Sequence, residues 1–234
     1  MPRRLALSRR LTTAAGWPTG VALTSFRYLW RTTPMTRHEC AAPWDELLPP
    51  PLPHAAGHDE VQAPRHGAGP LFHRRYAVTI AGAQMTPEQV IRRVARDVDC
   101  VAPTEFASFQ KVQGDEGRMA TNDEYVVRMA APWDGPVRVV DTTPTSFRLA
   151  TLDGHLEAGQ IEFRAYRQGD LLRFEIESWA RSATRTVHAL YDVLRMAKES
   201  QTHMWVSMLE RIVGLTGGRR HGRLEVLTRR AEAP

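Results

Sequence analysis

Residues 171–214 read LLRFEIESWARSATRTVHALYDVLRMAKESQTHMWVSMLERIVG, and this stretch decides the fold. In its first part, 171–181, apolar and polar side chains alternate, which is the pattern of a β-strand. From 184 to 214 the apolar residues recur at intervals of three and four instead, which predicts one long amphipathic helix. Gly217 and Gly218 follow and predict the end of that helix.

Alternating stretches separated by short turns precede this pair and predict six further strands. Thr86-Pro87-Glu88-Gln89 has the pattern of a helix N-terminus, with Thr86 as N-cap, Pro87 at the first helical position and Gln89 completing a capping box. The short gaps between the later strands are typical of antiparallel hairpins. The six strands are 72–80, 104–112, 122–131, 136–142, 145–152 and 158–168.

One helix cannot cover a seven-stranded sheet unless the sheet curves around it. The sequence therefore predicts an α+β fold, in which a seven-stranded curved antiparallel sheet grips a long C-terminal helix. This order of elements, over residues 71–215, resembles the helix-grip fold of the START and Bet v 1-like superfamily. The resemblance implies a cavity between sheet and helix, because members of that superfamily mostly enclose hydrophobic ligands.

A second resemblance rests on the segment TLDGHLEAG at 151–159, which continues through Phe163 to FEIESWAR at 174–181. This pattern resembles the bacterial and plant family known as domain of unknown function nineteen-ninety. Leu156 departs from the family pattern, which usually has Pro there. The family has no assigned activity, so the resemblance implies the fold more than the function.

Charge distribution argues against a nucleic-acid-binding body. The whole chain has a formal net charge of +5, but residues 71–216 hold 18 Lys and Arg against 19 Asp and Glu. A protein that binds a duplex normally carries a basic face on its folded body. No apolar run approaches the roughly 18 residues of a membrane span. Neither a phosphate-binding loop nor a metal-ligand spacing occurs, and we expect no cofactor and no metal.

The chain divides by composition into four parts. We expect residues 1–20 to be a disordered basic leader, and residues 21–70 to hold a short aromatic helix and a Pro-rich linker. The helix-grip domain is expected over 71–216, followed by a basic C-terminal tail over 217–234. Cys40 and Cys100 are too few for a disulfide framework, so reduced thiols and a cytoplasmic location are expected.

His155 and Glu157 are the candidate catalytic residues. They are two apart in an extended segment, so their side chains point to the same side, and a histidine beside a carboxylate can transfer protons. The alternative interpretation is a structural turn, in which His155 binds the backbone and Gly154 and Gly159 adopt unusual dihedral angles. Both interpretations are open at this point.

The candidate ligand-binding residues are those expected on the inner side of the sheet and on the facing side of the helix. The helix interrupts its apolar stripe in the middle, which leaves hydrogen-bonding capacity facing the sheet. We expect a small apolar or amphipathic ligand there; a cyclase- or hydrolase-like enzyme and an interaction protein with a filled core are the alternatives. The residues are Tyr125, Phe174, Ile176, Ser178, Tyr191, Leu194, Gln201 and Trp205.

Overall fold

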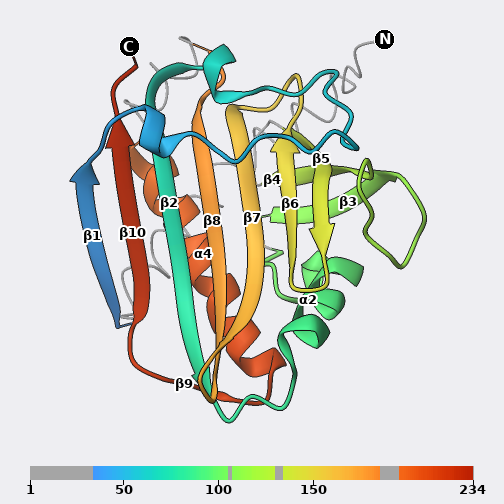
Figure 1. Cartoon of the computed structure of the whole chain (residues 1–234), viewed down its shortest axis with the longest axis vertical. Helices are drawn as coiled ribbons and strands as arrows, with labels where there is room; N and C mark the ends of the chain where they lie inside the picture. The colour runs from blue at the N-terminus through green and yellow to red at the C-terminus, as the bar shows by residue number, and fades with distance from the viewer. Residues whose placement is uncertain (1–33, 105–106, 130–133, 185–194, 234) are drawn as a thin grey trace, which may run out of the picture.

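The computed structural model describes residues 34–104, 107–129, 134–184 and 195–233, and the predicted strands and helices occur in these ranges in the predicted order (Figure 1). Two α-helices, α2 (Pro87–Arg96) and α4 (Arg195–Leu215), accompany three single-turn 3-10 helices, η1 (Asp45–Leu47), η2 (Pro64–His66) and η3 (Val98–Cys100). The seven predicted strands are β2 (Ala68–Ala81), β3 (Ala107–Gln113), β4 (Glu124–Met129), β5 (Asp134–Thr143), β6 (Ser146–Thr151), β7 (Glu157–Gln168) and β8 (Leu171–Ser182).

Both helix signals of the sequence are found at the expected places. Thr86 and Gln89 form the predicted capping box at the start of α2, with the Gln89 side chain accepting from the Thr86 backbone N–H at 2.8 Å. α4 ends before Gly217, whose φ of 66° lies in the left-handed region that favours glycine. The predicted leader and aromatic helix lie outside the described residues, as do positions 185–194 of the predicted C-terminal helix.

The sheet has ten strands in the described chain, three more than predicted. Its order is β1-β10-β2-β8-β7-β6-β5-β4-β3, with the short β9 (Arg219–Arg220) pairing the end of β2. β10 (Leu224–Ala231) lies antiparallel to β2, and β1 (Met35–Ala41) lies parallel to β10. The prediction of a basic tail over 217–234 is therefore wrong. Five arginines dominate its composition, but Leu224, Val226 and Thr228 share one side and form a strand.

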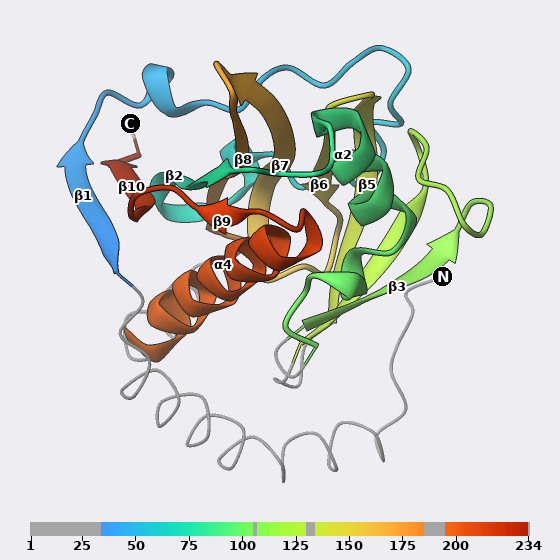
Figure 2. The same cartoon turned by 90° about the horizontal axis from the view of Figure 1, so that it is seen from below.

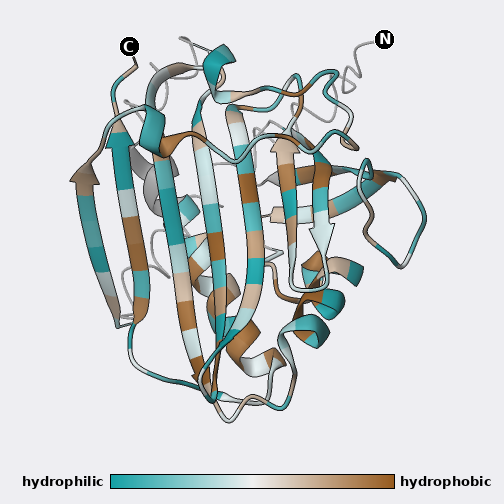
Figure 3. Ribbon diagram, in the orientation of Figure 1, coloured by the Kyte–Doolittle hydropathy of each residue, from teal (hydrophilic) through white to brown (hydrophobic). Residues whose placement is uncertain are grey.

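The curved sheet has two covered faces. α4 lies against the concave face, and residues 42–67 cross the convex face on the other side (Figure 2). The alternation that produces the two faces is visible along β7 and β8 (Figure 3). On the concave side, apolar residues of the sheet, α2 and α4 form one hydrophobic cluster, which includes Val90, Phe163, Ile176 and Leu209.

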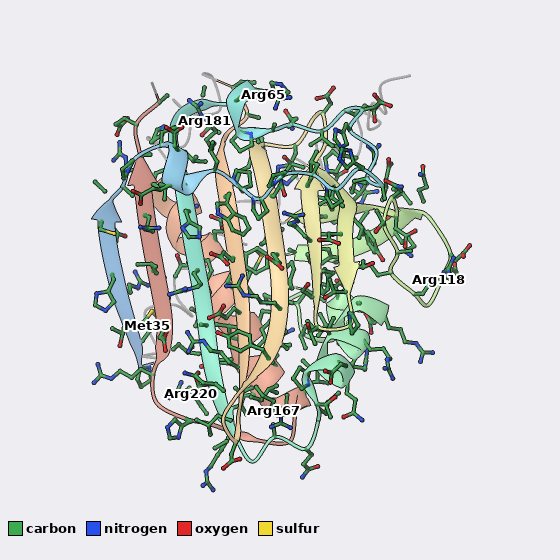
Figure 4. All side chains as sticks on the ribbon, in the orientation of Figure 1. Met35, Arg65, Arg118, Arg167, Arg181 and Arg220 are labelled. Atoms are coloured by element: carbon green, nitrogen blue, oxygen red, sulfur yellow. The ribbon has the colours of Figure 1, made fainter. Side chains whose placement is uncertain are left out.

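The segment over residues 42–67, which we call the belt, corrects the expectation of a linker. Side chains of the convex face hold it by donating to its backbone carbonyls: Arg148 to Pro50 at 3.3 Å, and Arg181 to Pro64 at 3.4 Å. Arg181 also lies over the Trp44 ring, 5.0 Å from its centroid (Figure 4). A proline-rich backbone has few N–H groups, so its carbonyls are what the sheet can bind. The belt helps to explain how the outward-facing Trp179 is only 6% exposed.

Gly159 provides a first prediction, because β7 passes close to β8 at this position. A Cβ at Gly159 would lie 1.9 Å from the Trp179 carbonyl oxygen, so the strands would have to move apart. We expect Gly159→Ala to lower the free energy of unfolding by about 2 kcal/mol in urea denaturation. Gly214→Ala is the matched control: that Cβ meets nothing within 4 Å in α4, and we expect it to stabilise by up to about 1 kcal/mol. Equal effects of both changes would contradict the prediction.

Candidate functional site

The register of the sheet places concave-facing residues in rows that run across the strands. In one row, Tyr76 of β2 lies beside Ile176 of β8, which lies beside Phe163 of β7. In the next row, Arg74 lies beside Ser178, which lies beside Ile161. The first row is therefore aromatic and aliphatic, whereas the second brings a guanidinium and a hydroxyl onto the same face.

α4 presents Gln201, Thr202 and Trp205 to these rows. The Trp205 ring meets the Phe163 ring edge to face, with centroids 5.8 Å apart. Gln201 joins two strands: its Oε1 accepts from Arg74 Nη1 at 3.2 Å, and its Nε2 donates to the Glu157 carboxylate at 3.3 and 3.4 Å. One turn of α4 thus has a polar contact with β2 and β7, and the following turn has an aromatic contact.

Two donors in this region have no hydrogen-bond partner among the described residues. They are the Tyr76 hydroxyl and the Trp205 indole N–H, and their residues are 0% and 6% exposed. Burial raises the pKa of Tyr76 from its ordinary value, and the positive charge of Arg74 and the nearby Thr202 side chain offset only part of this rise. The Tyr76 hydroxyl is therefore protonated and able to donate. Buried polar groups are normally paired, so two unpaired donors, one on β2 and one on α4, are a notable departure.

The structure places His155 and Glu157 in one turn but joins neither side chain to the other. The Glu157 backbone N–H donates to His155 Nδ1 at 2.9 Å, while the Glu157 carboxylate accepts from Gln201. Burial lowers the pKa of His155, and the nearby Glu157 carboxylate offsets part of that effect. The ring is neutral, with its basic nitrogen occupied by a backbone group. This geometry is that of the structural-turn interpretation.

The candidate ligand-binding residues separate into three groups. Ile176, Ser178, Gln201 and Trp205 come together around the rows described above. Phe174 lies in a neighbouring row beside Val78 and is fully buried. Tyr125 lies on β4, which β6 and β5 separate from β7, and Lys111 Nζ lies 5.3 Å from its ring centroid. Tyr191 and Leu194 lie outside the described residues.

The sequence analysis did not single out Arg74, Tyr76, Phe163 and Thr202 as site residues. The sequence does contain a signal for Arg74. It lies on the same side of its strand as Tyr76, Val78 and Ile80, so it is a charged residue on an otherwise apolar face. The meeting of Tyr76 with Thr202 depends on how α4 lies across the sheet, which strand periodicity does not predict.

Over the described ranges, no three His, Cys, Asp or Glu side chains gather as metal ligands. The same ranges hold no helix with the length and apolar character that crossing a bilayer requires. Cys40 is exposed and Cys100 is partly buried, and both are free thiols.

Comparison with known proteins gives one family and several similar folds. Residues 55–210 match the model of the family described as "Domain of unknown function (DUF1990)". Among curated proteins, no significant match is found. Solved structures with a similar fold include hypothetical protein jhp0584 from Helicobacter pylori, at 10% identity, a TM-score of 0.44, and coverage of 61% of this chain and 86% of that one.

Two plant proteins have comparable scores. A norcoclaurine synthase point mutant from Thalictrum flavum, in complex with a transition-state analogue, is 10% identical with a TM-score of 0.46, and covers 64% of this chain and 96% of its own. Major latex-like protein 151 from Panax ginseng is 10% identical with a TM-score of 0.43, and covers 62% and 97%.

Proposed function

The chain belongs to the family of the domain of unknown function DUF1990, and we propose that it binds a small amphipathic molecule between the concave face and α4. The family description names no activity, so the proposal depends on the geometry of the site.

The observation that carries the proposal is the pair of unpaired donors, Tyr76 Oη and Trp205 Nε1. Leaving a buried donor without a partner costs about 1–3 kcal/mol for each group. A bound molecule with a carbonyl, ether or carboxylate oxygen removes that cost by accepting from them. The surrounding apolar side chains, including Ile176 and Phe163, suit the rest of such a molecule.

Proton-transfer catalysis by His155 and Glu157 stays a prediction with less support. It requires the two side chains to act on the same substrate, whereas each is engaged in a different contact. An interaction protein with a filled core has no need of unpaired donors on its inner face, so the two donors favour binding.

Tyr76→Phe tests the proposal, because it removes only the hydroxyl group, beside which the Thr202 side chain lies. We expect the ligand-free variant to be more stable than the wild type by about 1 kcal/mol in urea denaturation. We also expect about fivefold weaker binding of Nile red, a fluorescent amphipathic probe with a carbonyl acceptor. The opposite directions of the two effects are characteristic of a donor kept for a ligand.

Tyr166→Phe is the matched control, because that hydroxyl lies on the convex face and donates to Glu175 at 3.1 Å. It should leave Nile red binding unchanged. Wild-type protein that does not bind Nile red and contains no small molecule in native mass spectrometry would overturn the proposal. Loss of stability in Tyr76→Phe would show instead that the hydroxyl has a structural partner.

A further inference from the structure

Arg74 is a buried cation on the concave face without a carboxylate partner among the described residues. It is 7% exposed, and its guanidinium lies 4.4 Å from the Phe72 ring centroid and donates to the neutral amide oxygen of Gln201. Arg138 and Arg173 have similar burial, but Arg138 pairs with Glu124 at 2.8 Å and Arg173 pairs with Glu175 at 2.7 Å. Arg181, which is 8% exposed, also lacks a carboxylate partner among the described residues, and it donates to the Pro64 carbonyl. A buried charge without a counter-charge is costly, so the position of Arg74 on the concave face requires a physical reason.

Gln201 lies between Arg74 and the Glu157 carboxylate. The two ends of the Gln201 amide bind different groups, Arg74 through the oxygen and Glu157 through the nitrogen. A guanidinium has five N–H donors, and one amide oxygen satisfies only part of that capacity. The remaining positive charge of Arg74 is therefore available on the same face as the unpaired donors.

Arg74, Tyr76 and Trp205 together form a site with donors and one positive charge. Arg74 and Tyr76 are two apart on one face of β2, and Gln201, which binds Arg74, is one turn from Trp205 on α4. The chemical complement is an anionic group with more than one acceptor oxygen. A carboxylate fits best, because its two oxygens match the planar guanidinium and leave lone pairs for neutral donors.

We propose that the molecule held between the concave face and α4 is an amphipathic carboxylate, whose anionic end pairs with Arg74. Its apolar part lies along Ile176, Phe163 and Trp205. This inference rests on the proposed function and specifies the ligand class for the same site.

The test compares two probes that differ in charge alone. Decanoate and methyl decanoate share a chain and a carbonyl, and each competes with Nile red for the wild-type protein and its variants. We expect wild-type protein to bind decanoate at least tenfold more tightly than the ester. Arg74→Gln should reduce this preference to about twofold or less, with ester binding unchanged, because a charge-assisted contact is lost.

Two further variants make the result specific. Arg75→Gln removes the same charge from the neighbouring position on the convex face, and it should keep the preference for decanoate. Gln201→Glu places a carboxylate beside Arg74, and it should weaken decanoate binding by tenfold or more.

The inference and the proposed function fail in different ways. Equal displacement of Nile red by both probes in wild-type protein would overturn the anionic ligand class and leave binding intact. Equal loss of preference in Arg74→Gln and Arg75→Gln would also overturn it, because the effect would then be one of net charge. Absence of Nile red binding would overturn the proposed function itself.

Discussion

Replacing Phe163 with alanine is expected to lower the free energy of unfolding by about 3–5 kcal/mol, the largest loss among the changes considered. Phe163 is fully buried at the centre of the concave face. Its ring stacks on Phe147 with centroids 4.7 Å apart and meets Trp205 on α4 at 5.8 Å. Removing it leaves a cavity between sheet and helix that neither neighbour can fill without moving. Urea denaturation followed by far-UV circular dichroism measures the effect.

Tyr166→Ala is the control for this change, because it removes a ring of similar size from the same strand. Tyr166 points to the convex face and is 38% exposed, so the expected loss is smaller, about 1 kcal/mol. Equal losses of stability in both variants would contradict the placement of Phe163 on the buried concave face and of Tyr166 on the exposed convex face.

The second large effect is expected on the convex face, where Glu175 connects two arginines. It accepts from Arg164 at 2.6 Å and from Arg173 at 2.7 Å, and it is only 2% exposed. Glu175→Gln removes the carboxylate that the buried Arg173 and the half-buried Arg164 share, although Arg173 keeps its pair with Glu225 and Arg164 keeps its pair with Glu177. We expect a loss of about 3 kcal/mol at neutral pH, measured by urea denaturation.

The pH dependence of this effect follows from the direction of the pKa shift. Burial alone would raise the pKa of Glu175, but the hydrogen bonds from Arg173 and Arg164 outweigh it and lower that pKa. A depressed carboxyl pKa stabilises the folded state fully above the ordinary value of about 4.3, and this stabilisation is lost as the pH falls through the folded pKa. The difference between wild type and Glu175→Gln should therefore shrink in acid. Glu116→Gln, at an exposed loop position, should change stability little at any pH.

The predictable part of the fold is the part with local signals. The capping box at Thr86, the alternation along 171–181 and the three-and-four spacing of α4 all arise within a few residues of each other, and the structure confirms these elements. The sequence did not predict β10, because Arg229 and Arg230 interrupt a short alternating run. Its assignment as a strand depends on its antiparallel pairing with β2, which is far away in the sequence. The belt has no periodicity, and it is held by groups from strands far away in sequence.

The same division applies to the site. Sequence reasoning correctly placed Gln201 and Trp205 on the sheet-facing side of the helix, as the three-and-four spacing along the helix predicts. Arg74 was not among the predicted site residues, because a lone charge on an apolar face indicates a site only when the facing residue is known. That the same amide binds Arg74 and Glu157 depends on the curvature of the sheet, and strand spacing alone carries no information about curvature.

The parallel pairing of β1 with β10 has a consequence for how the protein is made. Nearly all of the described chain lies between these two strands, and β1 has no other partner in the sheet. During synthesis β1 is translated long before β10, so β1 has no pairing partner until β10 is made. Contacts between segments so distant in sequence form slowly, because a large loop must close before they bring any stabilisation. We therefore expect the pairing of β1 with β10 to be among the last contacts of the sheet to form.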